Sequence, residues 1–286
     1  MIARKILATF VFEFFRSLTT SRIATSAVLA LFAPVMLTLI GFSLNIDGVR
    51  HQIPFPLLLI GVFQLLAIFL SVLLWATPVV YSELEGKTWT YLAIRPNGKF
   101  ASTLGKYFNA VFWASMTATV SLTLSCLVIS QFPWDPDIVI PRRVADQPEL
   151  YEKWHGMFTH SSSPIVIWYS LFPAIVLGAF ALSAIFIHIG LIAHKRGMVF
   201  AVIYGIIETV FAFLPAVVRQ FTVGFHLRNI GLKLADFDFE QFDAGVVTDE
   251  SGLWFHFLVL AIITGIHVGA SVYWLHSREY ITAEEA

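Results

Sequence analysis

The sequence predicts an all-α membrane protein with six transmembrane helices and with both termini in the cytoplasm. Of its 286 residues, 57% are hydrophobic and only 13% are charged, whereas soluble domains carry about 25% charged residues. A soluble fold with this composition could not cover its surface with polar groups. The composition therefore excludes soluble enzymes, DNA-binding domains and secreted disulfide scaffolds, and nucleic acid is not an expected partner.

Six long apolar stretches predict the membrane spans. Together they contain a single Asp, Glu, Lys or Arg residue, Glu208. Each has the about 20 residues that a helix needs to cross about 30 Å of hydrocarbon. Strands of a membrane barrel are about 10 residues long and alternate in polarity, so the long unbroken stretches favour helices. The predicted spans lie near residues 23–42, 55–81, 107–131, 164–193, 198–218 and 253–275.

The distribution of Lys and Arg sets the expected orientation. With the N-terminus in the cytoplasm, the inner segments hold eleven Lys and Arg residues against six carboxylates, and the outer segments hold seven against twelve. Cytoplasmic loops are enriched in Lys and Arg, and short loops are the most informative. The short turn that contains Lys195 and Arg196 is therefore the clearest local sign of a cytoplasmic loop.

Three of the segments outside the spans have recognisable patterns. Residues 1–20 predict an amphipathic helix in the cytoplasmic interface, since polar and apolar residues follow opposite sides at helical spacing. This helix is either a simple anchor or an elbow that also contacts a partner. Residues 21–286 would form the transmembrane domain. The outer loop 131–163 is expected to form a small folded cap, and the outer loop 219–252 is expected to dip shallowly into the outer interface.

A short cytoplasmic helix is predicted at residues 82–95. Ser82 and Glu85 have the spacing of a capping box, in which each side chain bonds the backbone N–H of the other. The turn Pro96-Asn97-Gly98 ends the helix. Its large apolar side chains are costly to expose unless lipid or protein covers them. The helix therefore either rests on lipid headgroups or docks a soluble subunit.

The residues between the second and third spans also resemble a family signature. They read Glu83-Leu84-Glu85-Gly86-Lys87-Thr88, then Ile94-Arg95-Pro96, then Gly105-Lys106. This pattern resembles the permease signature of the ABC-2 type transporter family, in which an acidic pair, a Gly-Thr, a leucine-rich turn, a Pro and a Gly-Lys occur at this place. The six-span architecture is similar along the whole chain. The signature departs in detail, because Lys87 separates Gly86 from Thr88 and Tyr91-Leu92-Ala93 replaces the usual leucine pair.

The resemblance implies a specific assembly. The chain would be one permease subunit, paired with a second one in a homo- or heterodimer, with two copies of a separate ATPase subunit bound beneath. ATP and Mg²⁺ would be held by the ATPase, and this chain would carry no cofactor, no metal and no catalytic residue. It would move an unidentified substrate out across a bacterial inner membrane. Helix 82–95 would be the coupling helix, and its ATPase contacts would be Glu83, Leu84, Glu85, Gly86, Lys87, Thr88, Trp89 and Leu92.

The chain itself is not expected to be an enzyme. Gly86-Lys87-Thr88 imitates the end of a phosphate-binding loop, but Tyr81 stands where that loop needs a glycine. The segment also follows a predicted membrane span rather than a buried strand. The sequence shows no Ser-His-Asp grouping and no regular metal-ligand spacing. Nucleotide hydrolysis is therefore assigned to a partner.

Glu208 is the main candidate for chemistry inside the membrane. A charged carboxylate there costs roughly 2.5–3.5 kcal/mol on insertion scales, so it is protonated, paired or facing water. It lines either a transport path or a dimer seam, or it bonds neighbouring helices. Gln64 and Thr119 are further candidates for the path, with helix packing as the alternative. Two other functions stay open: a non-transporting anchor or regulatory subunit, and an ion-coupled secondary carrier that uses Glu208.

Overall fold

The protein is a multi-pass bundle of apolar helices, as predicted. The computed structural model describes residues 2–43, 45–46, 49–50, 55–78, 97–132, 140, 146–193, 196–213, 217–237 and 251–277. Five helices in this part of the chain are long and apolar enough to cross a membrane. They are α2 (Thr20–Ser43), α3 (Pro56–Trp75), α6 (Gly98–Ile129), α9 (Pro164–Ile192) and α12 (Leu253–Ser277). Between α2 and α3, the two-residue strands β1 (Asn45–Ile46) and β2 (Val49–Arg50) pair antiparallel.

The local sequence explains where several helices begin. α3 and α9 open on Pro56 and Pro164, and the first helical position tolerates proline because its N–H would have no helical partner there. α6 follows Asn97, which has a left-handed backbone with φ of 58°. Asparagine adopts that conformation more readily than most residues. The predicted turn at 96–98 therefore coincides with the start of α6.

α6 and α9 form the centre of the bundle. α6 contacts α1 (Ile2–Ser17), α2, α3 and α9, whereas α9 contacts α3, α12 and two shorter helices, α10 (Gly197–Phe213) and α11 (Val223–Leu234). α9 is the most enclosed of the five long helices. Its buried positions include many small residues that allow close helix packing: Ser170, Ala174, Gly178, Ala179, Ala181, Ser183 and Ala184.

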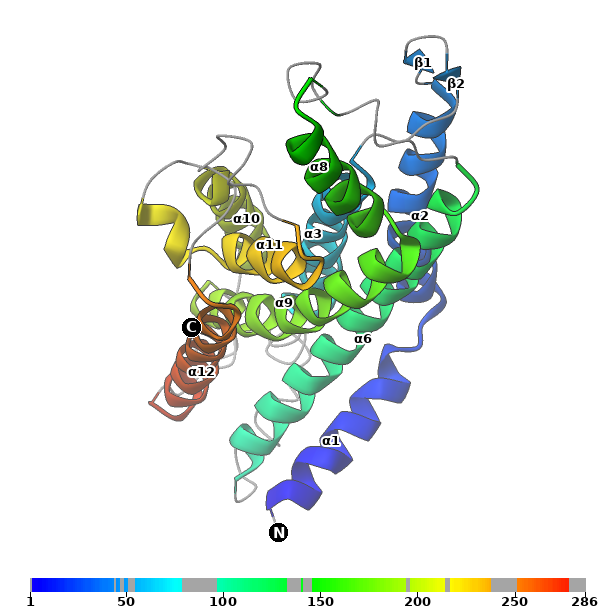
Figure 1. The fold of residues 1–286 in the computed structure, drawn as a ribbon. Coiled ribbons are helices and arrows are strands. Elements are labelled where there is room, and N and C mark those ends of the chain that lie inside the picture. Colours follow the sequence, from blue (N-terminus) through cyan, green and yellow to red (C-terminus); the bar gives the residue numbers. More distant parts are fainter. Residues whose placement is uncertain are drawn as a thin grey trace.

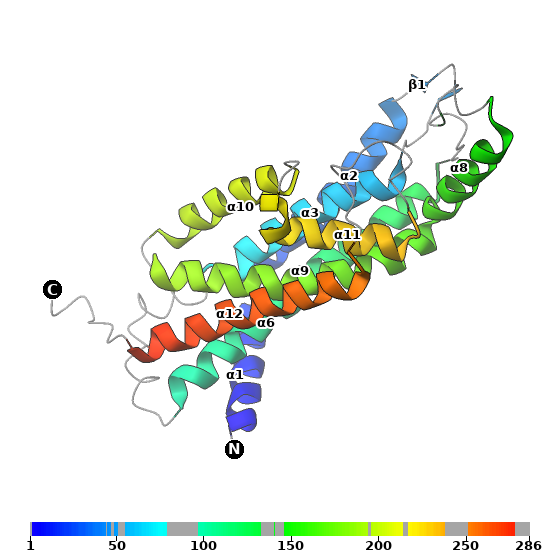
Figure 2. The same cartoon turned by 60° about the vertical axis from the view of Figure 1, so that its left-hand side comes forward.

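The two ends of the bundle carry different elements. The starts of α1 and α6 and the end of α12 lie at one end, while β1, β2 and α8 (Pro148–Ser161) lie at the opposite end (Figures 1 and 2). The loop predicted as a folded cap thus contains a helix, α8. Its side chains Trp154 and Phe158 are 2% and 1% exposed. This helix joins α9 through Ser162 and Ser163 alone.

The fifth predicted span, residues 198–218, is not among the five long helices. Its counterpart α10 has 17 residues, about 26 Å at 1.5 Å per residue, and the sequence places Pro215 just after it. Proline removes a helical hydrogen bond and disfavours a helical residue before it, which agrees with the end of α10 at Phe213. The chain resumes in the 3₁₀ helix η2 (Val217–Phe221) and then in α11.

α10 and α11 both pack along α9, one after the other (Figure 2). Phe237, three residues after the end of α11, contacts α8, where its ring is 5.6 Å from that of Phe158. Most of α11 is buried, including Phe225, Leu227 and Ile230. The segment 219–252, expected to lie outside and to dip into the interface, therefore contains a helix, α11, that packs on α9 and α12.

Candidate functional site

The predicted coupling helix at residues 82–95 lies outside the described residues. Its eight predicted ATPase contacts, Glu83 to Trp89 and Leu92, therefore stay predictions. The structure does describe both flanks of this segment, since α3 ends at Trp75 and α6 begins at Gly98. The contacts that hold the end of α3 and the first turns of α6 are therefore the part of the candidate site that the structure describes.

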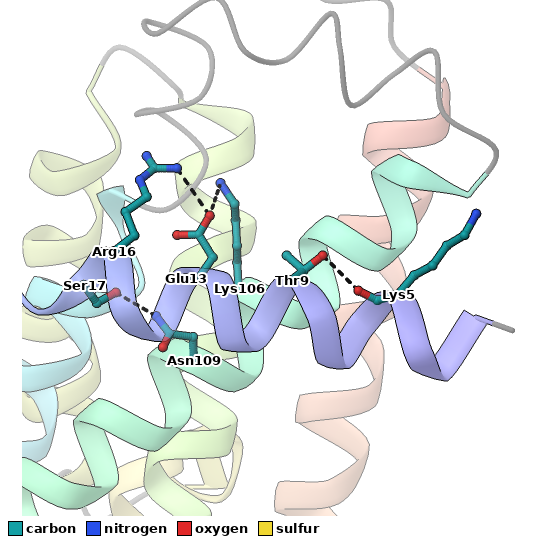
Figure 3. A network of polar contacts seen from close by, with 7 residues as sticks. All are labelled: Lys5, Thr9, Glu13, Arg16, Ser17, Lys106 and Asn109. Atoms are coloured by element: carbon teal, nitrogen blue, oxygen red, sulfur yellow. Dashed lines mark hydrogen bonds and ion pairs between the residues drawn. The ribbon is translucent and has the colours of Figure 1, made fainter.

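The first turns of α6 hold α1 through a buried polar junction (Figure 3). The Lys106 ammonium lies 3.6 Å from the Glu13 carboxylate, and Arg16 lies 3.3 Å from the same oxygen. One helix turn further, the Asn109 amide donates a hydrogen bond to Ser17 at 3.0 Å. The side chain of Lys106 is 6% exposed and that of Glu13 is 13% exposed. Because both groups have lost most of their water, removal of either would leave a poorly solvated charge.

Gly105 lets α1 approach α6 closely. A Cβ atom at this position would lie 2.7 Å from Thr9 Cβ and 3.0 Å from the Ile6 carbonyl oxygen. No larger residue fits without displacing α1. Gly105 and Lys106 thus have a structural role here, since the glycine admits α1 and the lysine binds Glu13. We define the contacts of Thr9, Glu13 and Ser17 with Gly105, Lys106 and Asn109 as the α1–α6 junction.

The polar side of α1 was recognisable in the sequence, but the sequence did not show that this side contacts α6. Lys5, Thr9 and Glu13 follow one side of the helix, which a membrane-surface helix would turn toward water. In the structure Thr9 and Glu13 face α6. The exposed side carries large apolar groups instead, with Leu7 61% and Phe15 66% exposed.

An aromatic stack links the junction to the end of α3. Phe14 of α1 stacks on Trp113 of α6 with ring centroids 5.2 Å apart, and Trp113 stacks on Trp75 of α3 at 5.2 Å. The Arg22 guanidinium of α2 lies 5.5 Å from the centre of the Trp75 ring. These stacked groups connect α1, α2, α3 and α6 at the end of α3, the flank that precedes the predicted coupling helix. Stacking and cation–π contacts of this kind each contribute about 0.5–1.5 kcal/mol beyond area burial.

Glu208 binds the start of α11. Its carboxylate accepts hydrogen bonds from the Gly224 backbone N–H at 2.8 Å and from the Tyr204 hydroxyl at 2.9 Å. Thr222 caps the same helix by accepting from the Phe225 N–H. Helix N-termini favour acceptors because their first N–H groups have no helical partner. The geometry thus gives Glu208 bonds to neighbouring elements, one of the two roles expected for it.

The other two path candidates have partners elsewhere. The amide of Gln64 faces α6, where Ser121 Oγ lies 3.3 Å from its nitrogen and the Ala118 carbonyl is in reach if the amide is turned. The Thr119 carbonyl accepts the Thr123 hydroxyl of its own helix. Glu208 bonds α10 and α11, so the hydrogen bonds described here do not join the three candidates into one cluster. Their place on a transport path stays a prediction.

A buried histidine pair, which sequence reasoning missed, ties α11 to α12. The Nδ1 atoms of His226 and His256 are 2.9 Å apart, and His226 Nε2 lies 2.7 Å from the Gln220 carbonyl oxygen. A carbonyl only accepts, so His226 carries a proton on Nε2. With both rings neutral, His256 Nδ1 then donates to His226. In the sequence these two histidines are 30 residues apart, and a separation of this length forms no recognisable motif.

Comparison of the chain with protein-family models and with curated proteins gives no match in either case. Among the residues that the structure describes, no three His, Cys, Asp or Glu side chains lie close enough to hold a metal ion. The functional argument therefore depends on the sequence pattern and on the contacts described above.

Proposed function

We propose that this chain is the permease subunit of an ATP-binding cassette exporter of the ABC-2 type. It pairs with a second permease subunit in the inner membrane, and two ATPase subunits, which hold ATP and Mg²⁺, bind below. The signature-like sequence at residues 83–106 supports the family, and five long apolar helices support a membrane-spanning role. The substrate is not identified by any of these features.

The observation that carries the proposal is the connection between the two flanks of helix 82–95. Trp75 on one flank stacks on Trp113 of α6, which also stacks on Phe14 of α1, and Lys106 on the other flank pairs with Glu13 of α1. A displacement of helix 82–95 would therefore move α3, α6 and α1 together rather than one helix alone. This is the mechanical requirement for a subunit that converts closure of an ATPase into movement of membrane helices.

Co-purification from native membranes tests the proposal. A tagged chain reconstituted into nanodiscs is expected to retain a stoichiometric ATPase, whose turnover falls at least several-fold in the Trp89→Ala variant. Trp254→Ala is the matched control, because Trp254 is 82% exposed at the start of α12, at the opposite end of the bundle from the start of α6. Its ATPase turnover should equal that of the wild type.

Two outcomes would contradict the proposal. If no ATPase is retained without nucleotide, with ATP or with vanadate, the chain is not a permease of this class. If an ATPase is retained but its turnover is unchanged by Trp89→Ala, and no substrate is transported, the chain is an anchor or regulatory subunit instead.

A further inference from the structure

α10 contacts the rest of the bundle along one narrow side. The buried residues of 197–212 are spaced three or four apart, as one side of a helix requires: Gly197, Ala201, Gly205, Glu208 and Ala212. The other residues in this range are exposed or half-buried. Small residues allow a second helix to approach closely, and α10 contacts both α3 and α9. The contacts at its two buried glycines therefore decide how firmly α10 is held.

The first glycine lies where α3, α9 and α10 meet. A Cβ atom at Gly197 would lie 3.0 Å from the Gly190 Cα atom and 3.7 Å from Thr77 Cγ2. A Cβ atom at Gly190 would in turn lie 3.0 Å from the Thr77 carbonyl oxygen. Thr77, two residues after the end of α3, is 4% exposed. The chain is thus enclosed by α9 and α10 shortly before the predicted coupling helix begins at residue 82.

The second glycine receives an aromatic ring of α3. A Cβ atom at Gly205 would overlap the outer end of the Phe69 ring, so this ring fills the space that a side chain would need. Along both segments the two contacts are eight residues apart, in opposite chain order, as expected for antiparallel helices that pack over about 12 Å. We define the contacts of Phe69 with Gly205, and of Thr77 with Gly190 and Gly197, as the α3–α10 clamp.

Further contacts connect the clamp to the break between α10 and α11. The Phe69 ring meets Phe186 of α9 edge to face, with centroids 5.3 Å apart, and Phe186 meets Tyr204 of α10 at 6.1 Å. Tyr204 donates to Glu208, which binds the start of α11. Close-packed interiors are barely compressible and transmit strain. A displacement of Phe69 would therefore also displace α10 and the start of α11.

We propose that the α3–α10 clamp transmits the movement of helix 82–95 to α10 and to the start of α11, so that these elements move with α3. This inference rests on the proposed function, because it needs an ATPase that displaces helix 82–95. The clamp adds a second connection to the one through the α1–α6 junction. One connection leaves the predicted coupling helix through α3 and the other through α6, so the ATPase reaches both sides of the bundle.

Hydrogen exchange of the full chain in nanodiscs tests the clamp without an ATPase. Gly205→Ala forces the Phe69 ring out of its place, and exchange at residues 198–213 should become at least fivefold faster. Alanine is the better helix former, so an effect confined to α10 itself would slow exchange instead. Phe69→Leu makes room for the added methyl group and should restore most of the protection in the double variant. Gly265→Ala, in open space on α12, is the control and should leave α10 unchanged.

The complex with the ATPase tests the transmission of movement. Trapping with ATP and vanadate should change exchange at least threefold, relative to the nucleotide-free complex, both in α1 (residues 2–17) and in α11 (residues 223–234). In Gly205→Ala the response of α11 should be lost. The response of α1 should remain, because the α1–α6 junction is intact in this variant, and Gly265→Ala should respond like the wild type.

The outcomes separate this inference from the permease function. Unchanged or slower exchange at residues 198–213 in Gly205→Ala, or a response of α11 that persists in this variant, would overturn the inference and leave the permease function in place. A wild type in which α1 responds to vanadate and α11 does not would overturn it in the same way. If no ATPase binds under any condition, the permease function fails and the inference fails with it.

Discussion

At the scale of single residues, Glu208 shows how a membrane-embedded carboxylate finds partners without a second charge. It accepts from the backbone at the start of α11, where Gly224 and Val223 are donors, and from the Tyr204 hydroxyl on its own helix. These donors satisfy its oxygens in a place where water is scarce. The carboxylate thus joins α10 to α11 at the break between them.

Substitution of Glu208 separates structure from transport. Glu208→Ala leaves the Gly224 N–H and the Tyr204 hydroxyl without an acceptor and should destabilise the protein by about 1–3 kcal/mol. Glu208→Gln keeps one oxygen for Gly224, and the Tyr204 hydroxyl can turn to accept from the amide, so its stability should stay near that of the wild type. Thermal unfolding in nanodiscs compares the variants. A stable Glu208→Gln protein that no longer transports substrate would instead place the carboxylate on the transport path.

Single residues also mark where prediction from the sequence reached its limit. That Glu208 needs a partner follows from the cost of a charge in lipid, but the partner is a backbone N–H 16 residues away. Because every residue except proline has a backbone N–H, the sequence does not show which of them binds a carboxylate. His226 and His256 were missed for a related reason, because their contact depends on how α11 folds back against α12.

At the scale of elements, the α1–α6 junction depends on a close approach at one glycine. Gly105→Leu places a side chain where Thr9 now lies, and overpacking of this kind costs about 1–3 kcal/mol. We expect α1 to detach, with faster hydrogen exchange at residues 2–17 and little change in α9. Gly265→Leu is the control because it has open space around it. Unchanged exchange in α1 of the Gly105→Leu variant would show that the junction does not hold this helix.

The ion pair in the same junction makes a separate prediction. Glu13→Gln and Lys106→Met should each speed exchange in α1, because each removes one side of a poorly solvated ion pair between α1 and α6. The double variant should exchange more slowly than the sum of the two effects implies, and this non-additivity measures the coupling. Purely additive effects would mean that the two side chains act independently.

The helical elements differ in how far their sequences predicted them. Long apolar runs predicted the positions of α2, α3, α6, α9 and α12 because length and hydrophobicity alone decide a span. The same criterion read 198–218 as one span, since it takes no account of where a helix must stop. Pro215, which lies in the sequence between α10 and η2, was the available signal.

At the scale of the whole molecule, the topology depends on whether α10 crosses the membrane. Exposed Glu152 of α8 and exposed Ser277 at the end of α12 are separated by α9, α10 and α12. Three crossings put these residues on opposite sides, and two crossings would put them on the same side. We expect α10, completed by α11, to return the chain, as the arrangement along α9 in Figure 2 indicates.

Thiol labelling distinguishes the two topologies. Glu152→Cys should react with a membrane-impermeant maleimide on intact cells, and Ser277→Cys should react only after permeabilisation. The wild type provides the background, since its one cysteine, Cys126, is buried. Reaction of both variants in intact cells would mean that α10 enters and leaves the bilayer on the same side.

Gly178 lies at the middle of α9, where side chains of α3 and α11 approach its backbone closely. A methyl group there would lie 2.7 Å from Leu227 Cδ1 and 3.1 Å from Ile68 Cδ1. Alanine at this buried position would therefore press on α3 and α11 at the same time. Natural variants that differ only at this position would be expected to differ in how closely α3 and α11 pack on α9, although no surface residue has changed.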